Sequence, residues 1–534
     1  MAAATGSYGD SPPVVGIGEL RYQPTPELFV VAQIGGAIDS AAISDIESGE
    51  FTGDGFPDIA VAWYATDLIS PATRQRFLTI FAATPDGSLE RHSDFNLYVY
   101  NSAADSLSIF RNGTSEIGSG DFDGDGDVDL AVASYFGDEI WFFENFGNGQ
   151  FGPHLKFMYG SINSSGNFTT PPEAVSADFD GDGRDELAYV ADVNQRIDGR
   201  MVQFWETQSS ISQMQRTSWD VGVGAMNVRW TRSLAAGDFD GDGAVDLAIT
   251  GSYDPTFETD PALVIWHAFD PVTQRFVEEN YAPDYICADV VALPAPDQPC
   301  VDNLVIGDLA RGDELEEWLN DCGDPLDFDV DDSLPTLNGA TSGDRGAALA
   351  FADVNDDGTF DIIARHRIGD PGNDRQIQIV LRDPTTLEWE RASPNQLDTS
   401  GLENSAADPQ LRPRNLVVAD LFGNSRPEIV AAFNPTFVNG QTNGDLVMAV
   451  WNNGCVADLN QDGEVGLSDL SLMMQSFGCG PDPWFADLTR DGCVDIEDLS
   501  ILLNMFDCGQ AGARQGPTTP AAVVEDHPRR QHRP

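Results

Sequence analysis

The chain has 534 residues, of which 41% are hydrophobic, and its 87 acidic and 28 basic residues give a formal net charge of −59. This charge disfavours binding to nucleic acid or anionic lipid, and no apolar run approaches the roughly 18 residues of a membrane span. The length exceeds what one hydrophobic core serves, so we expect two or more units, or repeats that stack or close into a ring.

The N-terminal segment, residues 1–25, lacks both the basic start and the apolar core of a secretion signal, and we expect it to be partly disordered. The first acidic loop follows at residues 50–58. Alternate side chains in this loop carry oxygen atoms, one of them a hydroxyl, at the spacing of a metal-binding loop. Its predicted metal ligands are Glu50, Thr52, Asp54 and Asp58.

A complete form of the same loop lies at residues 121–129. Its carboxylates and one backbone carbonyl supply the five or more oxygen ligands that a cation of calcium size requires. Gly126 stands where the chain must turn sharply, and the loop closes at its ninth residue before an apolar, β-prone run. We therefore predict a calcium site between two strands. Its ligands are Asp121, Asp123, Asp125 and Asp129, with Asp127 through its carbonyl.

Three further stretches repeat this pattern strongly, at residues 178–187, 238–247 and 353–362. Each again places the closing carboxylate in the ninth position, directly before an apolar run. We predict that each of them binds calcium, with the seventh residue contributing its carbonyl. The predicted ligands are Asp178, Asp180, Asp182, Arg184 and Glu186; Asp238, Asp240, Asp242, Ala244 and Asp246; and Asp353, Asn355, Asp357, Thr359 and Asp361.

Two other stretches keep only part of the pattern. At residues 308–315 the loop is two residues short, and we expect no metal there. At residues 420–428 the spacing is kept, but Phe422 cannot ligate a cation and Ser425 replaces the glycine. We expect this loop to have the same structure without a tightly bound metal.

The loops begin at residues 50, 121, 178, 238, 308, 353 and 420, which predicts seven units. Each interval holds about four short apolar runs separated by turn residues, without helical periodicity. Four strands repeated seven times predict a mainly β fold, a seven-bladed β-propeller over residues 26–453. Residues 281–345 are long, rich in Asp and Pro, and contain Cys287, Cys300 and Cys322, so we expect an insertion there instead of a regular blade.

These loops and their spacing resemble those of the FG-GAP and VCBS repeat proteins, which include the propellers of integrin α-subunits. In that family calcium sits in a hairpin of each blade and stiffens it, while ligands are usually met on the opposite face. The resemblance implies that the predicted calcium ions are structural.

A second pattern begins near Cys455 and predicts a separate domain over residues 454–510. Two loops, 29 residues apart, have EF-hand spacing closed by Asp in the twelfth position. Apolar residues follow each loop at i, i+3, i+4 and i+7, which predicts two short amphipathic helices. The predicted calcium ligands are Asp458, Asn460, Asp462, Glu464 and Asp469, then Asp487, Thr489, Asp491, Cys493 and Asp498.

This duplicated pattern resembles a type I dockerin, a module that binds cohesin domains, and implies a cohesin-like or cell-surface scaffold partner. Four cysteines lie in this module, whose hydrophobic core is too small to be stable without disulfide bonds or bound metal. If the helices run antiparallel, the end of one lies beside the loop before the other, which favours the pairs Cys455–Cys508 and Cys479–Cys493. Residues 511–534 turn basic, have no apolar period and are expected to be disordered.

Our leading hypothesis from the sequence is a secreted, non-enzymatic recognition or adhesion protein, whose propeller binds a polysaccharide or a glycoprotein. Calcium loops of this kind need near-millimolar calcium, and disulfides need an oxidising compartment. We therefore expect an extracellular or cell-surface location, with the true start and a signal upstream. A cytoplasmic location is the alternative.

No catalytic residue is predicted. Outside the basic tail, residues 365–367, Arg-His-Arg, are the one local concentration of base and positive charge, and we interpret the histidine as a surface or packing residue. One alternative function is a polysaccharide-degrading lyase or glycoside hydrolase delivered by its dockerin, because a pair of carboxylates at glycosidase separation leaves no sequence signature. Another is a structural component of a cell envelope.

Overall fold

The computed structural model divides the chain into two compact units, Met1–Asn453 and Gly454–Pro534. Within them it describes a defined set of residues, and the statements below concern these alone. The described residues are 22, 26–33, 38–67, 73–84, 88–101, 115–134, 139–158, 174–191, 201–207, 209–217, 221–222, 230–252, 262–270, 275–285, 287–294, 301–308, 315–320, 329–331, 334–335, 348–355, 357–366, 376–397, 416–422, 427–433, 436–438, 441–443, 445–453, 459, 465–479, 486 and 493–504.

The described strands of the first unit form mainly four-stranded antiparallel sheets, each named below by its innermost strand. Five of these follow the chain order. They are β2 (Ile38–Gly49), β3 (Asp58–Asp67), β4 (Thr73–Ala83) and β5 (Leu89–Asn101); β6 (Ser115–Gly120), β7 (Asp129–Ser134), β8 (Glu139–Phe143) and β9 (Leu155–Met158); β15 (Trp230–Gly237), β16 (Asp246–Ser252), β17 (Ala262–Asp270) and β18 (Arg275–Tyr285); β19 (Cys287–Pro294), β20 (Asp302–Asp308), β21 (Leu315–Leu319) and β22 (Asp329–Asp331); and β23 (Ala348–Ala352), β24 (Asp361–His366), β25 (Gln376–Arg382) and β26 (Trp389–Leu397).

A sixth four-stranded sheet combines strands from both ends of the unit. It contains β27 (Leu416–Ala419), β28 (Glu428–Phe433), β31 (Leu446–Trp451) and, at its outer edge, β1 (Glu27–Ala32). The β10 sheet has five strands: β10 (Ala174–Ala177), β11 (Glu186–Ala191), β12 (Met201–Glu206), β13 (Gln215–Arg216) and β14 (Val221–Gly222). A short 3-10 helix (Ile211–Gln213) precedes β13, and β29 (Thr436–Val438) and β30 (Gln441–Asn443) form a separate hairpin.

Apolar side chains fill the space between successive sheets. One cluster joins Phe51 and Leu78 of the β2 sheet to Leu130 and Trp141 of the β6 sheet. The second strands are rich in apolar residues, and all six residues of β28 are buried. A strand that is buried on both faces reads as a continuous apolar run, and this is how the sequence encodes the middle of each sheet.

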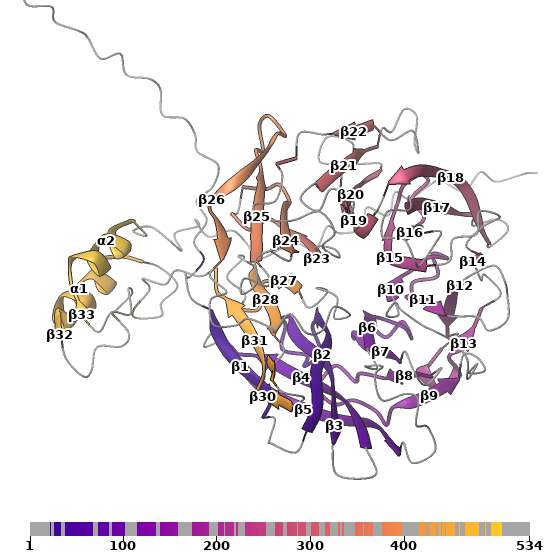
Figure 1. Cartoon of the computed structure of the whole chain (residues 1–534), viewed down its shortest axis with the longest axis horizontal. Helices are drawn as coiled ribbons and strands as arrows, with labels where there is room; N and C mark the ends of the chain where they lie inside the picture. Colours follow the sequence, from indigo (N-terminus) through magenta and orange to yellow (C-terminus); the bar gives the residue numbers. More distant parts are fainter. Residues whose placement is uncertain are drawn as a thin grey trace, which may run out of the picture. The chain divides into compact units, whose positions relative to one another are not determined.

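The sheets form a closed ring, which identifies the first unit as a β-propeller (Figure 1). The first strands contact one another in the order β2, β6, β10, β15, β19, β23 and β27, and β27 contacts β2 again. β1 completes the β27 sheet by antiparallel pairing with β31, from Glu27 opposite Val450 to Ala32 opposite Leu446. Segments from the two ends of the unit therefore lie side by side.

Two details differ from the sequence predictions. Seven regular blades were predicted, and six sheets have the four-stranded form; in the β10 sheet, β13 and β14 pair one after the other with the same edge of β12. The region predicted as an insertion forms the β19 sheet, so that prediction is wrong. The error came from placing its loop at residues 308–315, because Asp308 ends β20 and the connection from β19 to β20 precedes Asp302.

The second unit contains two short helices, α1 (Leu467–Ser476) and α2 (Ile496–Asn504), and a two-stranded sheet of β32 (Gly478–Cys479) and β33 (Cys493–Val494). Its core contains Val465, Met473, Ala486, Val494 and Leu502. Across the part of the chain that the structure describes, no helix combines the length and the apolar character needed to cross a bilayer.

Candidate metal centre

The acidic loops connect the first strand of a sheet to the second strand. In the β6 sheet, Asp121 directly follows β6 and Asp129 is the first residue of β7. The chain turns at Gly124 and Gly126, whose φ angles of 78° and 93° lie in the left-handed region that glycine adopts without strain. The loop therefore returns its ninth residue to the neighbourhood of its first.

Asp121 organises this loop. Its Oδ1 accepts hydrogen bonds from the backbone N–H groups of Gly124 (2.8 Å) and Asp125 (3.0 Å), and its Oδ2 accepts one from Gly126 (3.0 Å). Carboxylates that accept several backbone N–H groups fix a tight turn without help from regular secondary structure. The first predicted ligand thus also sets the shape of the loop.

Asp129 closes the loop and is completely buried. Its two oxygens accept hydrogen bonds from the N–H groups of Phe122 (3.1 Å) and Asn145 (2.8 Å), the latter just after the third strand, β8. Phe122, the second residue of the loop, is also fully buried and packs against Phe142. The closing carboxylate consequently ties the loop to two strands of its own sheet.

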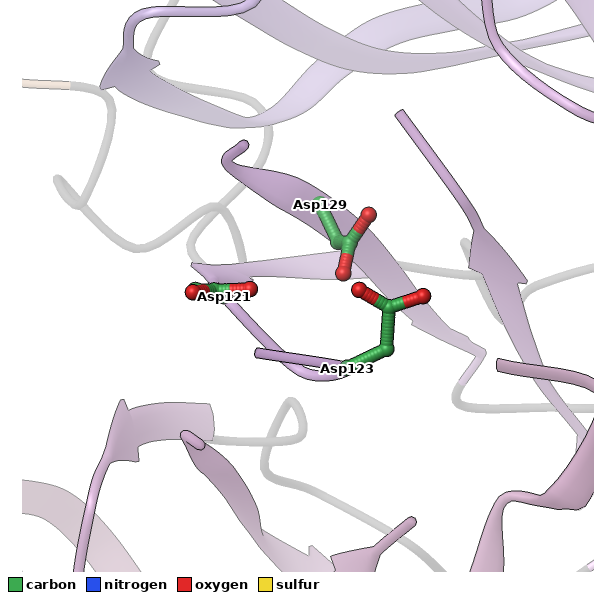
Figure 2. Close-up of side chains that lie close together, drawn as sticks. All are labelled: Asp121, Asp123 and Asp129. Atoms are coloured by element: carbon green, nitrogen blue, oxygen red, sulfur yellow. The ribbon is translucent and has the colours of Figure 1, made fainter. Parts of the chain in front are cut away.

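Three carboxylates of this loop converge. One oxygen from each of Asp121, Asp123 and Asp129 lies within 4.8 Å of the others, and Figure 2 shows Asp123 and Asp129 turned toward one another. Asp123 Oδ1 is buried and accepts no hydrogen bond. A buried carboxylate oxygen without a donor is costly unless a cation meets it, so the site fits an oxygen-liganded cation such as Ca²⁺.

The electrostatics of this cluster point the same way. Burial, reinforced by the charges of Asp125, Glu144 and Asp121, raises the pKa of Asp123 to about 6. Burial also raises the pKa of Asp129 to about 8, although its two backbone hydrogen bonds oppose that shift. Without a counter-charge Asp129 therefore retains its proton near neutral pH and Asp123 ionises less readily than an ordinary aspartate, and a divalent cation would relieve the crowding.

The next two loops along the ring repeat the arrangement. The residues that converge within 4.8 Å are Asp178, Asp180 and Glu186 in one loop, and Asp238, Asp240 and Asp246 in the other. The N–H groups of Phe179 and Phe239 again donate to the closing carboxylates, at 2.9 Å in both cases. Burial raises the pKa of Glu186 to about 9. Three consecutive sheets thus carry the same triad.

The loops at residues 50–58 and 353–361 share the framework without a described triad. Asp58 accepts the N–H groups of Phe51 and Ala83, and Asp361 accepts those of Val354 and Arg382. The carboxylates that open these loops also accept backbone N–H groups. Their side chains provide fewer charges, because Thr52 and Asn355 occupy the third position.

The fifth position of each of these four loops carries a carboxylate with a hydrogen-bond partner inside the loop. Its carboxylate accepts the backbone N–H of the seventh residue, and among the described residues it is absent from the triads. Asp182 also forms an ion pair with Arg184. The fifth-position residues are Asp125, Asp182, Asp242 and Asp357, and the corresponding seventh residues are Asp127, Arg184, Ala244 and Thr359.

In the two remaining loops of the propeller, the described residues do not include a complete ligand set. Glu428 accepts the N–H groups of Leu421 and Asn453, as a closing carboxylate should, but residues 423–426 lie outside the described part. In the β19 sheet, the closing position falls on Asn303, whose Oδ1 accepts the N–H of Asn320 at 2.9 Å. An amide replaces the carboxylate at this position.

In the second unit, only the closing residues of the predicted EF-hand loops are described in full. Asp469 and Asp498 are completely buried and accept the N–H groups of Gly466 (2.8 Å) and Asp495 (2.7 Å). Both therefore cap the start of a helix. Cys493 is described by its backbone alone, and the other predicted ligands, which are Asp458, Asn460, Asp462, Glu464, Asp487, Thr489 and Asp491, lie outside the described residues.

The described residues do not test the predicted cysteine pairs, because the side chains of all four cysteines lie outside them. No disulfide is found among the described residues, and Cys455 and Cys508 lie outside them. The backbones of Cys479 and Cys493 are direct partners in the antiparallel pair of β32 and β33.

At the Arg-His-Arg stretch, Arg365 is fully buried, donates to the carbonyl of Ala432 and lies over the ring of Phe433, so it is a packing residue.

Sequence reasoning missed the residues that join one sheet to the next. The side-chain amides of Asn145, Asn320 and Asn453 donate to the backbone carbonyls of Phe51, Phe239 and Val354, each in the loop of the preceding sheet. All three asparagines follow the third strand of their sheet. An asparagine shortly after the third strand is therefore a pattern visible in the sequence, but its hydrogen bond to the preceding sheet can be identified only from the fold.

Comparison with known proteins agrees with the repeat. Residues 121–189 match the family model of the FG-GAP-like repeat, a segment that runs from the loop of the β6 sheet to the second strand of the β10 sheet. Among solved structures, the chain is similar to that of an Agrocybe aegerita lectin described as recognising non-reducing terminal N-acetylglucosamine. That match has 15% identity and a TM-score of 0.44, and covers 76% of this chain and 94% of that chain. No curated protein matches this chain significantly.

Proposed function

We propose that this chain is a secreted, calcium-binding recognition or adhesion protein. Its propeller has seven blades, counting the five-stranded β10 sheet, and binds a glycan or a protein ligand. Its second unit is a dockerin-like anchor for a cohesin-type partner. The location that fits this function is extracellular or at a cell surface.

The observation that carries the proposal is the repetition of one carboxylate triad in three successive sheets. A reaction centre occurs once in a chain, whereas a cation that stiffens a repeated hairpin is expected in several blades. Asp121, Asp123 and Asp129 and their equivalents would hold the ions, and Ca²⁺ would supply the positive charge that the crowded carboxylates lack. The triads would therefore be scaffold, and recognition would belong to other surfaces of the propeller.

The proposed anchor is supported by the duplicated helices of the second unit. Leu467 and Ile496 occupy equivalent first positions of α1 and α2 and are 75% and 74% exposed. Met474 and Leu503, seven residues further along each helix, are also exposed. A spacing of seven places each pair on one helix face, so each helix offers the same apolar pair to a partner.

Calcium binding can be tested by thermal unfolding of the full chain. With dissociation constants of about 10⁻⁴–10⁻³ M, 10 mM Ca²⁺ would stabilise the fold by about 1–3 kcal/mol for each occupied loop. We expect the unfolding temperature to rise with Ca²⁺ and to fall again with EDTA, with a much smaller effect of Mg²⁺. Unchanged melting in EDTA would contradict the calcium proposal.

Recognition can be tested by applying the calcium-loaded chain to an array of glycans and glycoproteins. We expect saturable binding to a restricted class, abolished by EDTA, without change to the bound glycan. Release of new reducing ends or unsaturated products from a polysaccharide would instead identify an enzyme.

For the anchor, a recombinant cohesin domain is the probe. Replacing Leu467 and Ile496 together by Ser should weaken binding of the cohesin without affecting binding of the propeller's ligand.

A further inference from the structure

We propose that Asp185 and Asp302 are positioning residues, each of which holds the first ligand of the metal loop in the preceding sheet. Neither residue belongs to a triad of its own loop. The inference rests on the proposed binding of calcium and adds to it a physical link between neighbouring sheets.

Each of the two residues forms a reciprocal pair of hydrogen bonds across a sheet boundary. The N–H of Asp121 donates to Asp185 Oδ2 and the N–H of Asp185 donates to the carbonyl of Asp121, both at 2.9 Å. Asp238 and Asp302 repeat the pattern, at 2.9 Å and 2.8 Å. We call each such pair an aspartate clasp. Both clasps join residues that are 64 positions apart in the chain.

The residue that each clasp holds is the one that shapes its loop. Asp238, like Asp121, uses its side chain to accept N–H groups within the loop, from Gly241 (2.7 Å) and Gly243 (2.9 Å). Its backbone N–H and carbonyl are both engaged by Asp302. The first ligand is thus fixed on one side by its own loop and on the other by the next sheet, and loss of the clasp frees its main chain to rotate.

A glycine makes room for each clasp. A Cβ atom on Gly120 would lie 2.8 Å from an oxygen of Asp185, and one on Gly237 would lie 2.8 Å from an oxygen of Asp302. These contacts are shorter than real Cβ atoms allow, so any larger residue would displace the carboxylate.

At these two boundaries, a glycine directly before the loop occurs together with an aspartate in the next sheet. At the other boundaries the two residues do not occur together. Where the residue before a loop is Ala177, Ala352 or Ala419, the position equivalent to Asp185 in the next sheet is Val245, Pro427 or Pro57, and Gly49 lies opposite Val128. A valine or proline side chain cannot accept a hydrogen bond. The clasp is therefore a feature of particular boundaries and not of the repeat as a whole.

The clasp gives the β19 sheet a role in metal binding that its own loop does not have. Its closing residue is Asn303, yet Asp302 directly before it holds Asp238 of the β15 sheet. A sheet without a complete set of carboxylates thus supports the loop of its neighbour. A substitution in the β19 sheet should consequently weaken calcium binding in the β15 sheet.

Hydrogen–deuterium exchange of the full chain, followed by mass spectrometry during a calcium titration, reports each loop separately. For Asp302→Ala, we expect the Ca²⁺ concentration that half-protects residues 238–246 to rise about tenfold, which corresponds to about 1.4 kcal/mol. The peptide over residues 121–129 should keep its original midpoint. Asp185→Ala should give the opposite result, so each variant is the matched control of the other.

Two further variants distinguish positioning from general damage. Asp302→Asn retains an oxygen that can accept the N–H of Asp238 and should restore most of the protection, whereas Gly237→Ala should reproduce the loss without changing the aspartate. Equal shifts of both loops in every variant, or unchanged midpoints in Asp302→Ala and Asp185→Ala, would overturn the inference. If the unsubstituted chain showed no calcium-dependent protection in any loop, the proposed calcium binding itself would fail and the inference with it.

Discussion

The β6 and β19 sheets have the same hydrogen-bonded framework and different chemistry. In both, the residue that follows the third strand donates its N–H to the closing residue of the loop, Asn145 to Asp129 and Asn320 to Asn303. The same two asparagines donate their side-chain amides to the loop of the preceding sheet. Of these two sheets, only the β6 sheet places three carboxylates together among the described residues. The framework of a blade is therefore independent of its capacity to hold a cation.

The amide at the closing position of the β19 sheet has a different second partner from the closing carboxylates of the other loops. In the other loops, the N–H seven residues before the closing residue donates to its second oxygen. Seven residues before Asn303 the sequence has Pro296, which carries no N–H. In the β19 sheet, Asn303 Nδ2 donates to Glu317 at 2.9 Å.

Glu317 supplies the charge that holds the β19 sheet to the β23 sheet. It is completely buried and accepts hydrogen bonds from Arg382 (3.0 Å) and from the Trp389 indole (2.7 Å). The boundary between the β19 and β23 sheets is therefore held by a buried ion pair, whereas other boundaries lie next to the proposed calcium loops. Substitutions at these two kinds of boundary should respond differently to calcium.

The largest expected effect is that of Glu317→Ala. Removing one partner of a buried ion pair leaves Arg382 uncompensated and costs about 3–5 kcal/mol of unfolding free energy. Chemical denaturation should show this loss equally in Ca²⁺ and in EDTA. The double variant Glu317→Leu with Arg382→Met should recover most of the stability, since it removes both charges. A loss that disappeared in Ca²⁺ would mean that this boundary is not independent of the metal loops.

Exchanging the closing residues of the two sheets tests whether the closing position requires a carboxylate. Asp129→Asn turns the β6 loop into the β19 form while Phe122 still offers its N–H, so it should cost about 1–3 kcal/mol. It should also abolish calcium-dependent protection of residues 121–129, because it removes a ligand charge. Differential scanning calorimetry and hydrogen exchange would measure the two effects.

The reverse change, Asn303→Asp, serves as the control. It replaces the donor that faces Glu317 by a second buried carboxylate, and it should destabilise the chain without creating calcium binding. A gain of calcium-dependent stability in this variant would show that the framework alone is sufficient for a site.

The stability of the calcium-free protein should fall as the pH rises. Burial raises the pKa of Asp129 and of Asp361 to about 8 and that of Glu186 to about 9, far above the unfolded value of about 4. The folded state then binds more protons than the unfolded state between these values, so its stability is lost as the pH rises through about 8–9. Melting in EDTA at pH 5, 7 and 9 would show a decreasing unfolding temperature.

Calcium should reverse this trend, because a bound cation favours the ionised carboxylates. The increase in unfolding temperature caused by Ca²⁺ should therefore be larger at pH 9 than at pH 5. Asn303 does not titrate, so Asn303→Asp should steepen the fall in EDTA. A melting temperature independent of pH in EDTA would contradict the assignment of these groups as the source.

The smallest expected effect is that of the inter-sheet amide hydrogen bonds of Asn145, Asn320 and Asn453, which we call asparagine latches. Asn145→Ala removes the amide hydrogen bonds to the carbonyls of Phe51 (3.2 Å) and Val128 (3.0 Å) and should cost about 1 kcal/mol. Asn320→Ala removes the equivalent bonds in the β19 sheet and should cost the same. Similar losses from urea denaturation at both sites would support a shared framework, and a calcium-dependent loss at Asn320 alone would contradict it.

The local features of this fold could be predicted from the sequence, because they depend on residues close together in the chain. The first, third and ninth positions of the loops at residues 121, 178 and 238, which the sequence offers as metal ligands, lie together in the structure. The blade at Asp302 was placed wrongly because its loop lacks the carboxylates that mark the others. Asp185, Asp302 and the asparagine latches could not be predicted, since their partners lie in a neighbouring sheet about 60 or more residues away.

The pairing of β1 with β31 has a mechanical consequence. Glu27 begins β1 opposite Val450, near the end of β31, so a pulling force applied at residues 27 and 451 acts on adjacent, antiparallel ends. Such a load breaks the hydrogen bonds between β1 and β31 one residue pair after another, instead of loading all of them at the same time. Under tension the ring should therefore open first at this seam, at low force, while its other sheets remain folded.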